Sequence, residues 1–233
     1  LGERALAVTA LSPSLPARER VAVEEFVRAF GIRHEFIETR ELADPRYRAN
    51  QPDRCYYCKD ELFTKLAELA RARSIAAVAY GVNVDDLDDF RPGQQAAHQH
   101  GVLTPLLDAG LSKTEIRALS RRAGLPTWDK PAAACLASRI AYGVQVTEDI
   151  LRMIERGEEA LRALGFRQVR VRYHGSPDGA GELVRIEIAA EELPRALTPE
   201  MAQKFAEIFK ALGCRYVTLD LEGYRRGSFN PAR

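Results

Sequence analysis

The hydrophobic and polar positions in the first half of the chain switch repeatedly between strand-like and helix-like patterns. The predicted strands are residues 4–11, 33–40 and 74–82. Helical stretches at residues 16–30, 57–73 and 113–123 lie between or after them. The run at 74–82, "SIAAVAYGV", is almost continuously apolar, so we expect a strand buried on both faces. Strands separated by helices predict a parallel sheet covered by helices on both sides.

Residues of the kind that end and begin helices mark the element boundaries. Ser112 and Glu115 have the spacing of a capping box, and Gly124 follows as a stop signal. Thr147 is placed to cap a helix that runs to Leu164. These positions predict a helix that begins at each cap.

The second half has a different pattern, with a helix, a predicted hairpin, a helix and a final strand. The expected strands are residues 167–174, 182–189 and 215–222, and the expected second helix is 199–212. This order predicts a smaller α+β domain with an antiparallel sheet. We place the boundary in the loop around 129–146, which divides the chain into domains 1–141 and 142–233.

Composition narrows the class of protein without naming a function. The chain has 233 residues, 46% of them hydrophobic, and a net charge of +1. It can bury a sizeable core, and its overall charge favours neither nucleic acid nor membrane as a partner. No apolar run approaches a membrane span and no stretch resembles a signal peptide. With only four cysteines, we expect a protein of the reducing cytoplasm.

Cys55 and Cys58 form a C-x-x-C pair where a helix is predicted to begin. This spacing is compatible with a disulfide, a redox pair, a zinc site or an iron–sulfur cluster. Cys135 lies in the small-residue stretch "KPAAACLASR" near the predicted domain boundary. By itself, this cysteine is better explained as a packed small hydrophobic residue than as a site residue. The residues alone therefore leave the choice open.

Four longer motifs carry a specific resemblance. They are "RCYYCK", "GVNVDDLDDFRPG", "LSKTEIRALSRRAGLPTWDKPAAACLASR" and "RYVTLDLEGYRRGSFN". In this order, from about Ala5 to Asn230, the chain resembles the LarE-type sulfur transferases, which are PP-loop ATP pyrophosphatases. The resemblance implies an adenine-nucleotide α-hydrolase-like parallel sheet. It also implies ATP- and Mg²⁺-dependent conversion of the carboxylates of pyridinium-3,5-biscarboxylic acid mononucleotide to thiocarboxylates, for nickel-pincer nucleotide synthesis.

Members of this family obtain sulfur in two ways. One type sacrifices a cysteine of its own, whereas the other resembles enzymes in which three cysteines hold a 4Fe–4S cluster. The pair Cys55 and Cys58, together with Cys135 beside "LASR", resembles the cluster type. Three thiolates would leave one of four irons open for sulfide from an external donor. Sacrificial use of Cys135 is the alternative.

The family's phosphate loop, S-G-G-x-D-S after the first strand, is not found in this sequence. Its backbone N–H groups would hold the phosphates of ATP. The sequence begins near what would be the family's second strand, so we expect this loop upstream of Leu1. A non-catalytic metal carrier is the alternative if the loop is truly absent.

The resemblance also assigns roles to individual residues. Cys135, Ser138, Arg139 and Glu158 match active-site positions, with Arg139 suited to a phosphate or carboxylate. The acidic loop after the third predicted strand is expected to serve nucleotide, magnesium or the loop's own structure. Its candidate residues are Asp85, Asp86, Asp89 and Arg91.

Arg170 and Arg172 alternate with valines and therefore leave one face of a strand. With Arg225 they are expected to bind the phosphate of the small nucleotide substrate; a solvated strand face is the simpler alternative. Family members place such arginines near a subunit interface, which implies a homo-oligomer, a hexamer. A related tRNA-thiolating enzyme is a further alternative, but the small net charge does not favour nucleic acid.

Overall fold

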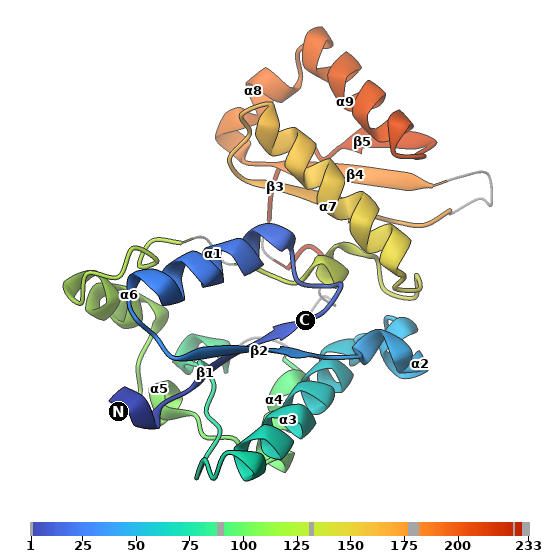
Figure 1. Ribbon diagram of the computed structural model, residues 1–233. Helices are drawn as coiled ribbons and strands as arrows, with labels where there is room; N and C mark the ends of the chain where they lie inside the picture. Colours follow the sequence, from blue (N-terminus) through green and yellow to red (C-terminus); the bar gives the residue numbers. More distant parts are fainter. Residues whose placement is uncertain (1, 88–90, 131–132, 177–181, 226, 230–233) are drawn as a thin grey trace.

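Two parallel strands joined by a helix begin the chain. The computed structural model describes residues 2–87, 91–130, 133–176, 182–225 and 227–229. After a short 3₁₀ turn (Gly2–Arg4), β1 (Ala7–Leu11) pairs with β2 (His34–Glu38), and α1 (Ala17–Ala29) connects them. Figure 1 shows α1 on one side of this pair and α3 (Arg54–Ala72) on the other. The predicted mixed α/β class with a parallel sheet is confirmed in this lobe.

Further short helices complete the N-terminal lobe. They are η2 (Glu41–Ala43), α2 (Pro45–Arg48), η3 (Val84–Asp86), α4 (Gly93–Gln99), α5 (Pro105–Asp108) and α6 (Lys113–Arg122). Phe63 of α3 packs with Ala96 and Ala97 of α4 in a small buried cluster. This cluster holds α4 against α3.

The prediction of a doubly buried strand at residues 74–82 is wrong. Within the described residues this stretch makes one isolated parallel bridge, Ala79 to Leu103, and most of its alanines are exposed. An apolar run becomes a buried strand only where neighbouring strands pair with it on both sides. Among the described residues, only the short segment around Leu103 pairs with this stretch. The hydrophobic pattern therefore predicted a longer and more buried strand than the structure has.

The C-terminal lobe is a three-stranded sheet in the order β3-β4-β5. Its strands are β3 (Val169–Tyr173), β4 (Leu183–Ile188) and β5 (Tyr216–Leu219), and its helices are α7 (Glu148–Ala163), η5 (Ala190–Glu192), α8 (Leu193–Ala196) and α9 (Pro199–Ala211). The hairpin β3–β4 is antiparallel as predicted. The prediction of a wholly antiparallel sheet is wrong, because β5 runs parallel to β4. The chain crosses over through α8 and α9 between these two strands, and such a crossover is what parallel pairing requires.

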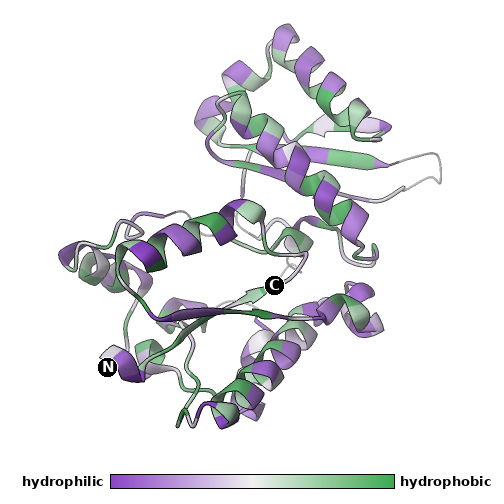
Figure 2. Cartoon of the chain, viewed as in Figure 1, coloured by the Kyte–Doolittle hydropathy of each residue, from purple (hydrophilic) through white to green (hydrophobic). Residues whose placement is uncertain are grey.

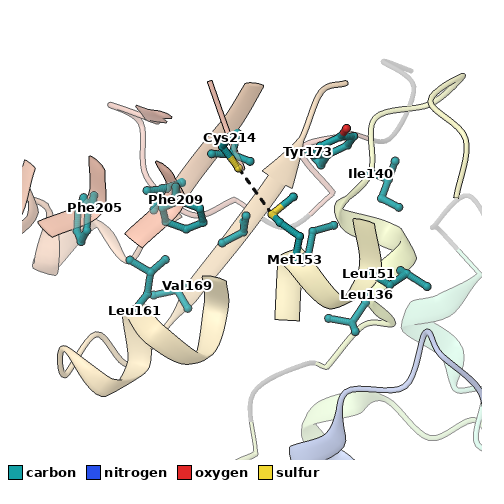
Figure 3. Close-up of a cluster of buried hydrophobic side chains, with 14 of the residues drawn as sticks. Leu136, Ile140, Leu151, Met153, Leu161, Val169, Tyr173, Phe205, Phe209 and Cys214 are labelled. Atoms are coloured by element: carbon teal, nitrogen blue, oxygen red, sulfur yellow. Dashed lines mark hydrogen bonds between the residues drawn. The ribbon is translucent and has the colours of Figure 1, made fainter. Parts of the chain in front are cut away.

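The main hydrophobic core lies between this sheet and its helices. α7 contributes Leu151, Ile154 and Leu161, and α9 contributes Phe205 and Phe209. Figure 3 shows Leu151, Leu161, Phe205 and Phe209 of this core. The buried Cys214 sulfur lies 3.9 Å from the sulfur of Met153. The pattern of apolar and polar residues along α7 in Figure 2 corresponds to one face on the core and one face outward. In the described part of the chain, no helix combines the length and apolar character that a membrane crossing needs.

A loop that is distant in sequence also belongs to this core. The 3₁₀ turn η4 (Leu136–Arg139) follows Cys135 directly. Leu136 and Ile140 are each 1% exposed and pack in the cluster of the C-terminal sheet. The N–H of Ala141 donates to the carbonyl of Tyr173 at the end of β3. The segment from Ala133 to Ala141, called the cysteine loop below, therefore packs against the C-terminal lobe and is hydrogen-bonded to it.

The predicted caps are confirmed. Ser112 and Glu115 form both hydrogen bonds of a capping box at the start of α6. The hydroxyl of Thr147 accepts from the N–H of Ile150 at the start of α7. Gly165 after α7 has φ +88°, a left-handed conformation that glycine adopts at low cost.

Gly157 allows α7 to approach α9 closely. A Cβ at this position would lie 2.5 Å from the Phe209 ring, which is fully buried. We predict that Gly157→Ala destabilises the protein by about 1–2 kcal/mol, because overpacking costs about 1–3 kcal/mol and helix propensity returns up to about 1 kcal/mol. Urea unfolding measures this change. Phe209→Leu should partly relieve the clash, so the double variant should lose less than the sum of the two; strict additivity would contradict this packing.

Candidate functional site

The candidate site lies where the carboxyl ends of β1 and β2 meet the cysteine loop. After β1, the carbonyl of Ser14 accepts from the N–H of Leu136 at 2.8 Å. The Ser14 hydroxyl is 2.7 Å from the hydroxyl of Tyr47, which lies in α2 after β2. In parallel α/β sheets, ligands bind at this edge of the strands. The fold therefore gathers three separate segments at an edge where sites usually form.

Asn50 joins the segment before the cysteine pair to the segment after Cys135. Its side chain is fully buried, and its Nδ2 donates to the carbonyls of Ile140, Ala141 and Val144 at 3.3, 2.8 and 2.9 Å. The backbone has φ +52°, a left-handed conformation that asparagine tolerates better than most residues. One side chain thus bonds to the loop at several points.

Arg54 reinforces the same connection. Its Nη1 donates to the Asn50 side-chain oxygen and, at 2.8 Å, to the carbonyl of Ala137. Its Nη2 lies 4.0 Å from the sulfur of Cys55. Burial lowers the pKa of Arg54, but negative charge at Cys135 and Cys55 outweighs this and the net shift is upward. A permanent positive charge therefore stands beside the cysteines.

Cys55 and Cys58 lie at the start of α3, which begins three residues before the predicted start at residue 57. Their separation of three positions puts both sulfurs on one side of the helix. Gly93 at the start of α4 packs against this turn: a Cβ there would lie 3.2 Å from the carbonyl oxygen of Cys55. The close approach of α4 restricts one side of the cysteine turn.

The loop that carries Cys135 is held by its own hydrogen bonds. The Cys135 carbonyl accepts from the Ser138 hydroxyl and from Arg139 Nη1, both at 2.8 Å. The same Arg139 nitrogen donates to the Ala134 carbonyl at 2.5 Å. The backbone on both sides of the thiol is therefore fixed.

The three thiols interact electrostatically. Desolvation and then the charge of Cys135 raise the pKa of Cys55, and Arg54 opposes this shift. Burial, followed by the charges of Cys135 and Glu41, raises the pKa of Cys58 to about 12. Cys135 thus affects both members of the C-x-x-C pair, although it comes from a distant segment. The fourth thiol, Cys214, belongs to the core described above, and burial raises its pKa to about 11.

The convergence is not tight enough for one small ion. Over the described ranges, no group of three or more histidine, cysteine, aspartate or glutamate side chains is placed to hold a single metal ion. All four cysteines are free thiols.

Two buried groups border the thiols. Glu41 is 3% exposed, and its Oε2 has no hydrogen-bond partner. Tyr47 is 1% exposed, and burial followed by the charge of Cys135 raises its pKa.

Arg139 and Glu158 form an ion pair inside the protein. Arg139 Nε lies 2.9 Å from Glu158 Oε1, and the two side chains are 1% and 2% exposed. Glu158 also accepts from Arg162 at 2.6 Å and from the N–H of Val171 at 3.3 Å. Burial raises the pKa of Glu158, but Arg139 and other arginines lower it more, so the carboxylate is ionised at neutral pH. In this arrangement Arg139 contacts Glu158 and the loop carbonyls.

The acidic loop uses its carboxylates to fix its own structure. Asp86 accepts from the N–H of Asn83 and pairs with Arg91 at 2.9 Å. Asp85 accepts from the N–H of Lys113 at 2.5 Å, at the start of α6. Asp89, the remaining candidate of this loop, lies outside the described residues. Of the roles considered for Asp85, Asp86 and Arg91, these contacts favour the structural one.

The arginines expected to bind substrate phosphate have different contacts in the structure. Arg170 and Arg172 are 7% and 6% exposed, so the alternative of a solvated strand face is wrong. Arg172 pairs with Glu187 at 2.8 Å. Arg225 pairs with Glu222 at 2.6 Å and with Asp220 at 3.4 Å. Arg170 donates to the carbonyl of Val169 and lines a pocket beside the cysteine loop.

Sequence reasoning missed Asn50, Arg54 and Glu41. Asn50 precedes Arg54 by one helical turn, and Arg54 stands directly before Cys55. This spacing was the available signal, but the carbonyls that these residues bind lie far along the chain. Glu41 has no comparable signal in its neighbourhood.

Comparisons with known proteins identify relatives of the chain. No protein-family model matches the chain. It is 44% identical over 230 residues to an uncharacterized protein of Synechocystis sp., covering 99% of this chain and 84% of that protein. It is 36% identical over 192 residues to the pyridinium-3,5-bisthiocarboxylic acid mononucleotide synthase of Lactiplantibacillus plantarum, covering 81% of this chain and 66% of that enzyme. An uncharacterized protein of Methanocaldococcus jannaschii is 28% identical over 176 residues, which are 76% of this chain and 66% of that protein.

The similarity to the Lactiplantibacillus synthase places the chain among enzymes that transfer sulfur. The chain belongs to the LarE-type sulfur transferase family, as its motifs indicated. It spans about two thirds of the length of the Lactiplantibacillus synthase.

We predict that Asn50→Asp separates the cysteine loop from α3. The change keeps the side-chain size but turns an oxygen toward three buried carbonyls, so the free energy of unfolding should fall by on the order of 3 kcal/mol. Urea unfolding measures this loss. Gln51→Glu is the matched control, because the same chemical change occurs on an exposed neighbour, and it should stay within about 0.5 kcal/mol. Equal effects of the two changes would contradict the role of Asn50.

Proposed function

We propose that the protein is an ATP-dependent sulfur transferase that converts the carboxylates of pyridinium-3,5-biscarboxylic acid mononucleotide to thiocarboxylates, for nickel-pincer nucleotide synthesis. A substrate carboxylate oxygen attacks the α-phosphorus of ATP, and pyrophosphate leaves. Sulfide then attacks the acyl carbon, a C–S bond forms, and AMP leaves with the electron pair of the broken C–O bond. One carboxylate becomes one thiocarboxylate for each ATP consumed.

One observation supports this proposal above the others. Cys135 comes from a segment distant from Cys55 and Cys58, yet its charge acts on both of them, and its loop bonds to Ser14 after β1. A structural disulfide or a lone redox pair would not need the third cysteine. A 4Fe–4S cluster held by these three residues would supply sulfide through the iron that no protein thiolate binds.

The surrounding residues fit such a cluster. Cysteine sulfurs are the ligands that iron–sulfur clusters take, and their bound form is the thiolate. Arg54 places positive charge beside these thiolates at Cys55. The raised pKa of Cys58 means that its proton must leave when a metal binds. The protein therefore offers both the ligands and a compensating charge.

We propose positioning roles for the buried residues behind the thiols. Ser138 and Arg139 hold the Cys135 carbonyl, and Glu158 holds Arg139. Removing one partner of a buried ion pair leaves an uncompensated charge, which costs about 3–5 kcal/mol. In this arrangement Glu158 acts on the reaction through the position of the cysteine loop.

The cluster assignment predicts a specific metal content. After anaerobic reconstitution with iron and sulfide, the full chain should contain iron and acid-labile sulfide in nearly equal amounts. Replacing any one of Cys55, Cys58 or Cys135 by Ala should abolish both, because two thiolates rarely keep a cluster. Colorimetric iron and sulfide analysis checks this.

Cys214→Ala is the matched control. Cys214 is a thiol buried in the core of the C-terminal lobe, and its sulfur contacts Met153. This variant should keep its iron and labile sulfide. Stoichiometric zinc without labile sulfide in the reconstituted protein would contradict the cluster.

A further inference from the structure

A groove of about 590 Å³ lies along one face of α6. Its lining consists of residues one helical turn apart on α6 and one aromatic residue from the loop that follows. These residues are Thr114, Arg117, Ala118, Arg121, Arg122 and Trp128, and we call this surface the α6 groove. Figure 1 shows α6 at the outer edge of the N-terminal lobe, well apart from the C-terminal lobe. The groove is therefore separate from the cysteine site.

Contacts within the groove fix the position of its walls. The Arg121 guanidinium lies over the Trp128 ring, 4.9 Å from its centroid. Arg117 Nη2 donates to the carbonyl of Lys130 at 3.1 Å, and the N–H of Trp128 donates to the carbonyl of Leu125 at 3.3 Å. Stacking on an aromatic ring holds a guanidinium plane in place and leaves its N–H edge open to a ligand. The helix and the loop thus form one preorganised surface.

Carboxylates do not balance the arginines of the α6 groove. In the part of the chain that the structure describes, no ion pair includes Arg117, Arg121 or Arg122. By contrast, the neighbouring Lys130 pairs with Glu19 at 2.6 Å. The whole chain has a net charge of only +1. The groove is therefore a local concentration of positive charge.

The exposure of the walls indicates the size class of the ligand. Every lining residue except the half-buried Arg117 is exposed, and Trp128 keeps 36% of its surface accessible. Small-molecule sites enclose about 70–90% of the ligand surface, which walls as exposed as these do not achieve. A segment of a larger molecule needs cover on one side only. The groove suits such a segment.

Charge and composition favour protein over nucleic acid as the source of this segment. Thr114 and Trp128 are each followed by an acidic residue, Glu115 and Asp129, so the positive charge does not extend into a longer stripe along the chain. Nucleic-acid surfaces need such a patch or stripe to follow a phosphate backbone. Arginine and tryptophan are also the residues that dominate the energetic centres of protein interfaces.

We propose that the α6 groove is a docking site for an acidic segment of a partner protein. Charge complementarity identifies the occupant: its carboxylates accept hydrogen bonds from Arg121 and Arg122. An apolar side chain of the same segment packs on Trp128, above the small side chain of Ala118. Docking at this surface does not depend on the sulfur-transfer reaction.

The fluorescence of Trp128 tests the docking site directly, because the sequence contains one tryptophan. The probe is the end-blocked acidic octapeptide EEFEELEE, added to the full chain at low salt, and its neutral counterpart QQFQQLQQ is the matched peptide. The acidic peptide should change the Trp128 emission saturably, and its affinity should fall as salt rises, since exposed charges are screened. The neutral peptide should leave the emission unchanged.

Variants of the two exposed arginines connect binding to the groove. Arg121→Gln and Arg122→Gln should each weaken binding of the acidic peptide about three- to fivefold, and the double variant about tenfold or more. Arg121→Lys keeps the charge without the paired N–H groups and should recover part of the affinity. Arg28→Gln is the matched control, because Arg28 is an exposed arginine in the last turn of α1, outside the groove. It should bind the peptide like the unchanged protein.

Three outcomes would overturn the proposal. The first is no saturable response to the acidic peptide up to millimolar concentration. The second is unchanged peptide binding in the arginine variants with a lower free energy of unfolding, which would show that the arginines only stabilise the end of α6. The third is tighter binding of single-stranded octauridylate than of the acidic peptide, weakened by the same variants, which would assign the groove to nucleic acid.

Discussion

The site depends on one set of buried hydrogen bonds, those that Asn50 and Arg54 make to the loop after Cys135. Asn50 donates to three carbonyls of that loop, and Arg54 links Asn50 to the Ala137 carbonyl. Arg54 is also the residue before Cys55. The bonds that hold the loop therefore set the distance between Cys135 and the C-x-x-C pair. Without them, the three sulfurs belong to two independent segments.

A second buried group, the pair Arg139–Glu158, attaches this loop to the C-terminal lobe. Such a pair is weak evidence for stability, because the loss of hydration can exceed the attraction between the charges. Its contribution here is geometric. Arg139 holds the carbonyls of Ala134 and Cys135, while Glu158 is fixed by the Val171 N–H of β3. Gly157, the neighbour of Glu158 on α7, permits close packing of this helix on Phe209 of α9, so the packing of the core also helps to position Glu158.

The sequence predicted the local elements well and the long-range arrangement less well. Caps such as Ser112 with Glu115, and Thr147, depend on neighbouring residues, and they appear where expected. The strand predicted at residues 74–82 was wrong, because a buried strand needs neighbouring strands and an apolar run does not specify them. The prediction of an antiparallel β5 was wrong for a similar reason, because the direction of pairing depends on the crossover between the strands. Cys55, Cys58 and Cys135 came from family resemblance, whereas Asn50 was missed because its partners are distant in the chain.

The central claim is that the cysteines hold a sulfur-delivering group and are not themselves consumed. Intact-mass analysis of the full-length protein after turnover with ATP, magnesium and a sulfide source tests it most directly. The account predicts several products for each chain and an unmodified Cys135, because a thiolate bound to iron is poorly placed for elimination. A single product for each chain, with the elements of hydrogen sulfide lost at Cys135, would contradict it.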